Sequence, residues 1–204
     1  MSIEFLITAL IVVLAPGTGV VYTLATGLAQ GRMASVAAAF GCTLGIIPAI
    51  LASVFGLAAL FHTSALLFQT VKFAGVAYLL YLAWQTLRDR GTLRVSGEGT
   101  PRRSLFAIAR NGFLINILNP KLSVFFLAFL PQFVSPAAAS PILEMLAMSA
   151  VFMAMTFAVF VVYGQFSGLM RDRVLSSERA IAWMRRSVAL AFAGFGLKLA
   201  LSSR

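Results

Sequence analysis

Two lysines and a few polar side chains lie inside long apolar stretches, and their types indicate which chemistry this sequence can perform. Lys72 and Lys121 are each flanked by apolar runs, and an ionisable residue in such a run marks a functional site by default. Thr18, Asn116 and Asn119 add hydroxyl and amide groups. Ammonium, amide and hydroxyl groups can hold a carboxylate or a zwitterion. We therefore expect a binding site for a small amino acid or organic acid.

Two prolines interrupt the apolar stretches that hold these residues. Ala15-Pro16-Gly17-Thr18-Gly19 surrounds the first, and Asn119-Pro120-Lys121 surrounds the second. A proline inside a helix removes one backbone hydrogen bond, and Gly17 makes unwinding easier. Asn119-Pro120 also predicts a helix N-cap followed by proline at the first helical position, so a half-helix could begin there and present its N–H groups to a carboxylate.

The two proline breaks have a structural explanation and a functional one. For either proline alone, a kink whose freed carbonyls are satisfied by neighbouring helices is sufficient. Breaks at corresponding places in two halves of a chain instead point to the binding site of a transporter. We therefore predict a substrate site formed by Pro16, Gly17, Thr18, Asn116, Asn119, Pro120 and Lys121, with Lys72 as a further candidate.

The other reactive residues do not form a catalytic or metal-binding group in the sequence. Cys42 is the only cysteine and His62 the only histidine, so no disulfide or thiolate cluster can form within one chain. Divalent cations prefer carboxylate or imidazole ligands, and the apolar stretches offer neither. We therefore expect no metal, no cofactor and no enzymatic activity.

Composition places these residues in a membrane protein. The 204 residues are 60% hydrophobic and only 11% charged, and runs of eighteen or more apolar residues are typical of membrane spans. The net charge of +10 does not indicate nucleic-acid binding, because eleven of the sixteen Lys and Arg residues lie between Arg88 and Arg110 or between Arg171 and Arg186. Such clusters are typical of short cytoplasmic loops that face anionic lipid headgroups.

The apolar stretches predict an all-α membrane protein with six transmembrane helices. The predicted spans are Ile3–Leu28, Ala34–Phe61, Ser64–Leu87, Gly112–Phe133, Leu143–Gly168 and Ser187–Leu201. The sixth span is short, so we expect Arg185 and Arg186 to reach toward the headgroups from its start. The residues Met1 to Phe5 lack the basic start of a secretory signal, so we expect the first helix to remain in the mature protein.

Charge counts in the loops predict the topology. The five loops hold one, none, six, none and five Lys or Arg residues, which predicts that the first, third and fifth are cytoplasmic and that both termini lie outside. We treat residues 1–204 as a single transmembrane domain of two half-repeats, about 1–88 and 110–204, joined by a basic cytoplasmic loop at 88–111. Because three helices per half is an odd number, the halves must be inverted, and the proline-broken helices are the first and the fourth.

Small residues recur at every fourth position of the second span. They are Ala37, Gly41, Gly45, Ala49 and Ser53. Such a stripe lets another helix approach closely, and we interpret Gly27-x-x-x-Gly31 and Gly164-x-x-x-Gly168 in the same way. These residues are predicted to pack rather than to bind substrate.

Several of these blocks resemble one known family. The block from Arg110 to Lys121 (RNGFLINILNPK), continuing to FLPQFV at 129–134, resembles the fourth-helix signature of the LysE/RhtB amino-acid exporters. Ala15-Pro16-Gly17 with GLAQGR at 27–32 resembles their first helix and turn. The stretch from Lys72 to Trp84 resembles their third helix, so that the resemblance runs in order over nearly the whole chain.

The resemblance implies a secondary transporter of the bacterial inner membrane that exports small amino acids or related metabolites by proton exchange. The sequence departs from the family at Thr18, where a second proline is usual, and at Ile46, Ile47 and Pro48, where members often carry an acidic or other polar residue. The second departure leaves no obvious intramembrane carboxylate for proton coupling.

Partners and alternative functions remain open at this stage. The expected partners are the small-molecule substrate and the lipid bilayer, with a homodimer as an open alternative and no nucleic acid. A CcdA-like membrane redox protein would need two facing cysteines, and this chain has one. A non-transporting assembly subunit would gain nothing from a buried lysine or from paired breaks.

Overall fold

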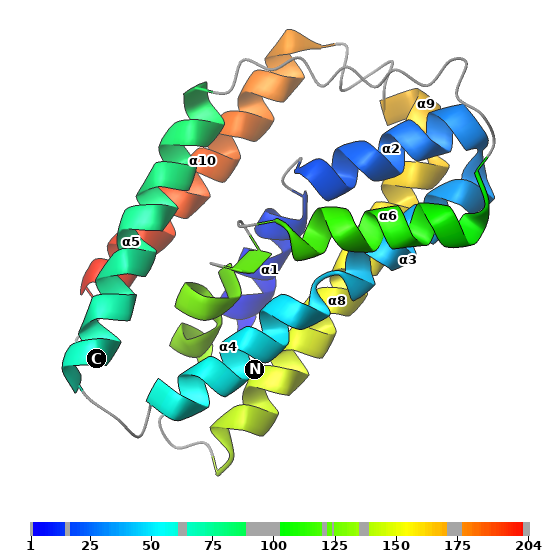
Figure 1. The fold of residues 1–204 in the computed structure, drawn as a ribbon. Coiled ribbons are helices and arrows are strands. Elements are labelled where there is room, and N and C mark those ends of the chain that lie inside the picture. Colours follow the sequence, from blue (N-terminus) through cyan, green and yellow to red (C-terminus); the bar gives the residue numbers. More distant parts are fainter. Residues whose placement is uncertain are drawn as a thin grey trace.

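The computed structural model describes residues 2–14, 17–60, 65–88, 103–119, 122–123, 125–134, 139–170 and 177–201 (Figure 1). Within these ranges the regular structure is helical. In order, the helices are α1 (Ile3–Leu14), α2 (Thr18–Gln30), α3 (Arg32–Leu44), α4 (Ile47–Leu60), α5 (Ala65–Arg88), α6 (Leu105–Ile117), η1 (Phe125–Phe129), η2 (Leu130–Phe133), α8 (Pro141–Gln165), α9 (Ser167–Met170) and α10 (Glu178–Leu201).

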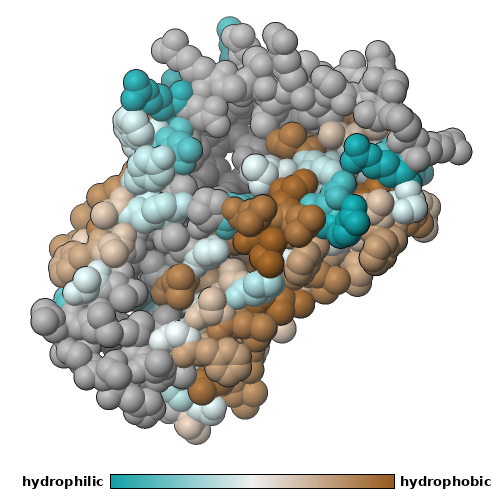
Figure 2. All heavy atoms as spheres, in the orientation of Figure 1, coloured by the Kyte–Doolittle hydropathy of each residue, from teal (hydrophilic) through white to brown (hydrophobic). Residues whose placement is uncertain are grey.

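The length and composition of the helices agree with a membrane protein. Arg32–Gly56 and Pro141–Gln165 are each long and apolar enough to cross a membrane, and α1 with α2 can form a third span. The predicted count of six spans is not established by this criterion and stays a prediction. Figure 2 shows apolar residues over much of the described lower and right-hand surface, with hydrophilic residues gathered toward the upper end. Phe55, Phe106 and Leu143 are examples of large apolar side chains that are mostly exposed.

The first predicted span is broken where the sequence predicted. Helix α1 ends at Leu14, α2 begins at Thr18, and the two are bent by 52°. Gly17 precedes α2 in an extended conformation. The hydroxyl of Tyr163 in α8 donates to the Leu14 carbonyl at 3.1 Å, so a neighbouring helix satisfies a backbone group that the break leaves without a helical partner.

The fourth span ends at Phe133 as predicted, but it begins earlier and is irregular in its second part. Helix α6 begins at Leu105 rather than at Gly112, because Ser104 caps it by accepting from the Ala107 N–H at 3.2 Å. Beyond the break, Leu122 and Ser123 are α-helical, and the Ser123 N–H donates to the Asn119 carbonyl at 3.5 Å. The chain then continues as the π-helical turn η1 and the 3-10 turn η2. The half-helix predicted to begin at Pro120 stays a prediction, because Pro120 and Lys121 lie outside the described residues. The Ser53 hydroxyl in α4 donates to the Phe126 carbonyl of η1 at 2.6 Å.

The second span contains a turn that the prediction did not include. The Ile46 N–H donates to the Thr43 carbonyl at 3.1 Å instead of to the Cys42 carbonyl, which would be its partner in a regular α-helix. Pro48 lies in the first turn of α4, where its missing N–H is tolerated. The Cys42 carbonyl is consequently available to another donor.

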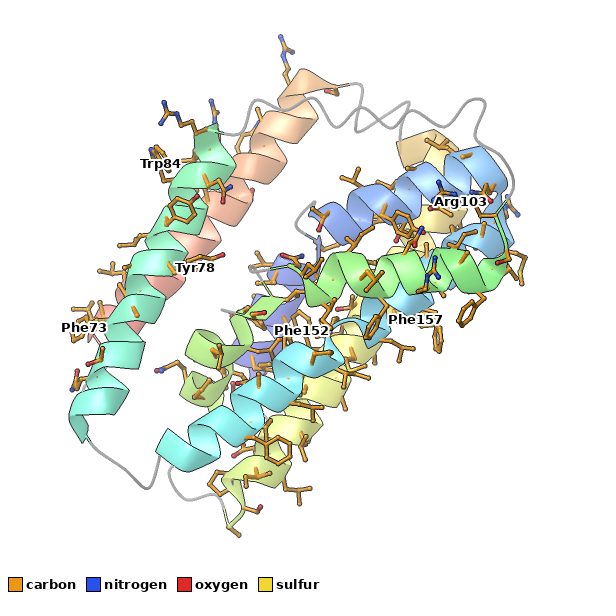
Figure 3. All side chains as sticks on the ribbon, in the orientation of Figure 1. Phe73, Tyr78, Trp84, Arg103, Phe152 and Phe157 are labelled. Atoms are coloured by element: carbon orange, nitrogen blue, oxygen red, sulfur yellow. The ribbon has the colours of Figure 1, made fainter. Side chains whose placement is uncertain are left out.

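Helices α5 and α10 pack against each other along their length and form one flank of the molecule (Figure 1). The bounds of α5 agree with the predicted third span. Helix α10 begins at Glu178 rather than at Ser187, so the prediction of a short sixth helix starting beside Arg185 and Arg186 is wrong. A helix can continue beyond the membrane into water through charged residues. The positions of Arg185 and Arg186 therefore did not mark the start of α10. Figure 3 shows Phe73 and Trp84 of α5 pointing away from the other helices.

The small residues of the second span pack closely, as predicted. A Cβ on Gly41 would collide with the backbone of Ala109 in α6, and a Cβ on Gly45 would lie 2.5 Å from the Phe113 carbonyl oxygen. Gly27 faces Gly164 in the same manner, with 2.8 Å between a built Cβ and the Gly164 carbonyl oxygen. Helices α3 and α6 can therefore approach to backbone contact.

The prediction of close packing is wrong for Gly31 and Gly168. A Cβ on either would meet nothing within 4 Å. Gly31 has φ +88° between α2 and α3, a conformation that other residues adopt only with strain. Glycine is therefore required at position 31 by the backbone conformation of the turn between α2 and α3, and not by a close contact between helices.

Replacing Gly41 with alanine should destabilise the protein. A methyl group there must push α6 away from α3, and overpacking of this kind typically costs about 1–3 kcal/mol. Thermal unfolding of the detergent-solubilised variant measures the effect. Gly56→Ala is the matched control, because a Cβ on Gly56 meets nothing within 4 Å. Equal midpoints for the two variants would show that the α3–α6 contact is loose.

Candidate functional site

A small cavity lies between the two broken helices. Its volume is about 40 Å³. The described residues that line it are Val12, Val13, Gly17, Gly19, Val20, Ile46, Asn116, Asn119, Leu122, Phe152, Thr156 and Phe160. They come from both sides of the first break, from both sides of the fourth-span break, from the turn before α4 and from α8.

The cavity lies between two apolar clusters. Phe125, Phe126 and Phe152 belong to the larger cluster, and their ring centroids lie 5.1 to 5.4 Å apart. Val20 and Phe160 belong to the second cluster, with Leu24, Ala39 and Cys42. Figure 3 shows Phe152 in the interior, between the helices that enclose the cavity. The cavity is therefore covered by apolar side chains on two sides.

Three of the predicted site residues line this cavity, namely Gly17, Asn116 and Asn119. A fourth, Thr18, contacts Asn119, whose Nδ2 donates to the Thr18 hydroxyl oxygen at 3.4 Å. This hydrogen bond joins the two breaks directly. The predicted residues from distant parts of the chain are thus brought together.

Four other predicted site residues cannot be placed in the same way. Pro16, Pro120 and Lys121 lie outside the described residues, and the side chain of Lys72 lies outside the described part of α5. The described residues on either side of Pro120-Lys121, Asn119 and Leu122, both line the cavity. The roles of Lys72 and Lys121 stay predictions.

Asn116 is held in a fixed orientation. Its side chain is buried, and its Nδ2 donates to the Cys42 carbonyl at 2.7 Å, which is the carbonyl left without a helical partner by the turn at Ile46. Because the amide nitrogen donates to a carbonyl, the amide oxygen must point the other way. A Cβ built on Gly19 would lie 3.0 Å from Asn116 Oδ1 and 2.9 Å from Phe160 Cε2. The amide oxygen is therefore directed toward Gly19 at the cavity wall.

The size and polarity of the cavity limit what this conformation can hold. A water molecule needs roughly 10–15 Å³ of such volume, so the cavity has room for a few water molecules and not for an amino acid. The described lining carries amide and hydroxyl groups but no charged side chain. No group of three or more His, Cys, Asp or Glu residues that could hold a metal ion occurs among the described residues.

Sequence reasoning missed the lining residues of α8 and the turn in the second span. Phe152, Thr156 and Phe160 are four residues apart and lie on one buried face of α8, but a buried face in an apolar helix resembles ordinary packing. Pro48 was the available signal for the turn at Ile46, because proline favours the first turn of a helix.

Comparisons with known proteins identify relatives of this chain. The sequence profile described as LysE type translocator matches residues 10–203. The chain is 38% identical over 134 residues to an uncharacterized membrane protein of Vibrio cholerae, which covers 66% of this chain and 65% of that protein. It is 36% identical over 135 residues to the homoserine/homoserine lactone efflux protein of Salmonella typhimurium, covering 65% of this chain and 64% of that one.

A further relative matches over nearly the full length. The leucine efflux protein of Klebsiella pneumoniae is 26% identical over 199 residues, which covers 97% of this chain and 93% of that protein. No solved structure matches the chain.

Proposed function

The chain belongs to the family of LysE type translocators, and on that premise we propose that it is a secondary transporter that exports small amino acids or related metabolites from the bacterial cytoplasm. The observation that carries the proposal is the cavity lined from both broken helices. Relatives named for the efflux of leucine and of homoserine support the same substrate class.

We propose further that the two halves form an inverted repeat. Several contacts support this arrangement. Helix α5 packs on its counterpart α10, and the second span packs on its counterpart α8. The Tyr163 hydroxyl, in the second half, donates to the Leu14 carbonyl at the break of the first half. The Ser53 hydroxyl, in the first half, donates to the Phe126 carbonyl in the broken segment of the second half. Each half therefore satisfies backbone groups of the other, as expected for two halves related by a two-fold axis in the membrane plane.

The proposed location is the inner membrane, with both termini outside. The end of the molecule that carries Arg32, Arg88 and Arg103, which we call the arginine end, would face the cytoplasm. Arg103 lies in this upper part of Figure 3, and its backbone N–H donates to Gln30 Oε1 at 2.7 Å. Coupling to proton exchange would require a titrating group inside the membrane. Lys121 is the candidate, since Glu4 and Glu144 lie near the starts of α1 and α8.

Transport by purified protein in sealed vesicles tests the proposed function. Vesicles are loaded with radiolabelled amino acids, with leucine and homoserine in the panel, and efflux is followed with and without an imposed pH gradient. We expect saturable efflux of at least one amino acid, and acceleration by the gradient if protons are exchanged. Protein-free vesicles give the background. Efflux no faster than this background across the whole panel would refute the proposal.

A further inference from the structure

The cavity lining includes hydrogen-bond acceptors that the proposed function leaves unassigned. Asn116 Oδ1 is the first of them. Its orientation is fixed by the 2.7 Å bond from Nδ2 to the Cys42 carbonyl, and the residue is 3% exposed. An amide oxygen has two lone pairs, so Asn116 can accept from a ligand without giving up its bond to Cys42.

Thr156 and the end of α1 supply further acceptors. The Thr156 hydroxyl donates to the Phe152 carbonyl at 2.9 Å, so its single proton is used and its oxygen lone pairs remain available as acceptors. Val12 and Val13 lie in the last turn of α1, where backbone carbonyls have no partner within the helix. The carbonyl end of a helix also carries partial negative charge. All these residues line the cavity.

These acceptors fit a group that carries several N–H donors and a positive charge. An ammonium group has three donors and no acceptor. It could donate to the amide oxygen, to the hydroxyl oxygen and to a carbonyl at the end of α1. A carboxylate offers acceptors only, so it could not form hydrogen bonds with these three acceptors.

We propose that Asn116 and Thr156, at the carbonyl end of α1, bind the ammonium group of the substrate. This inference rests on the proposed function and deepens it, because it assigns a role to each residue. The site then selects for a primary amine, whereas this set of residues does not recognise a free carboxylate. A 2-hydroxy acid of the same shape, which lacks the amine, should therefore bind much more weakly than the amino acid.

A competition experiment in vesicles tests this assignment. The labelled amino acid is the one that the wild-type protein transports fastest. The unlabelled competitors are the same amino acid and its 2-hydroxy acid, which keeps the carboxylate and lacks the ammonium group. We expect the amino acid to compete at least about tenfold better than the hydroxy acid. Because a hydrogen bond to a charged group is stronger than one between neutral groups, Asn116→Leu and Thr156→Val should each reduce this ratio severalfold. The ratio is independent of the amount of active protein.

Two variants are used so that the assignment is still tested if one of them does not fold. Asn116→Leu leaves the Cys42 carbonyl without its donor and could unfold the protein. Thr156→Val is nearly isosteric and removes a hydroxyl that donates only within its own helix. Asn111→Leu is the matched control, an amide on α6 that does not line the cavity, and it should keep the wild-type ratio.

Two results would overturn the assignment. One is a hydroxy acid that inhibits transport by the wild-type protein as strongly as the unlabelled amino acid does. The other is a wild-type ratio in Thr156→Val and in a folded Asn116→Leu protein. Either can occur while wild-type protein still transports amino acids, in which case the proposed function stands. Absence of any amino-acid transport by wild type contradicts the proposed function itself.

Discussion

Gly19→Leu should reduce export by at least about a hundredfold while the protein still inserts in the membrane. The α-carbon of Gly19 lies at the cavity wall, and the first carbon of a new side chain would already be 2.9 Å from the Phe160 ring and 3.0 Å from Asn116 Oδ1. A leucine side chain would therefore occupy the volume that the substrate needs. The measurement is the initial rate of efflux per amount of inserted protein in the vesicle assay.

A graded series distinguishes a blocked site from a damaged fold. Gly19→Ala adds one methyl group and should impair export of larger amino acids more than that of smaller ones. Gly56→Leu places the same leucine where a Cβ meets nothing within 4 Å, and it should transport at the wild-type rate. If Gly19→Leu exports normally, or if Gly19→Ala slows all substrates equally, substrate does not pass this cavity.

Lys121→Met should abolish export and leave membrane insertion intact. An ammonium group inside the membrane is costly unless it faces water or an anionic partner. Methionine has a similar length and carries no charge, so it should be tolerated by the fold. We propose that the partner of Lys121 is the substrate carboxylate. Its chain neighbours Asn119 and Leu122 both line the cavity.

Lys121→Arg should be almost as inactive, because a planar guanidinium does not replace a compact ammonium group. Lys198→Met provides the control, since this lysine lies near the end of α10 and long basic side chains near helix ends reach the headgroups. A Lys121→Met protein that inserts normally and exports at the wild-type rate would show that Lys121 is an anchor. The carboxylate site would then lie elsewhere.

The parts of the fold that local sequence controls were predicted from the sequence. Pro16 indicated the break between α1 and α2 because proline removes a backbone hydrogen bond whatever surrounds it. The small residues Gly41 and Gly45 indicated a close helix contact, because only small side chains permit one. Gly17, Asn116 and Asn119, which line the cavity, could be selected from the sequence because polar or helix-breaking residues are conspicuous in an apolar stretch.

The parts that depend on contacts between distant segments were not predicted. The amide of Asn116 is oriented by the Cys42 carbonyl, 74 residues away in sequence, and no local pattern gives that pairing. Phe152 and Phe160 are ordinary core residues by type, and their place at the cavity follows only from how α8 crosses the breaks. The start of α10 was missed because charge predicts where a membrane ends, whereas a helix may continue beyond it.

The exchange of hydrogen bonds between the halves has an evolutionary consequence. The Leu14 carbonyl of the first half accepts a hydrogen bond from Tyr163, and the Phe126 carbonyl of the second half accepts one from Ser53. In both cases the donor comes from the other half. If the halves descend from one duplicated gene, as the proposed inverted repeat implies, an ancestral half would have left its corresponding carbonyl without a donor, and an unsatisfied carbonyl in lipid costs several kcal/mol. Such a half would have depended on a second copy, inserted in the opposite direction, to supply that donor.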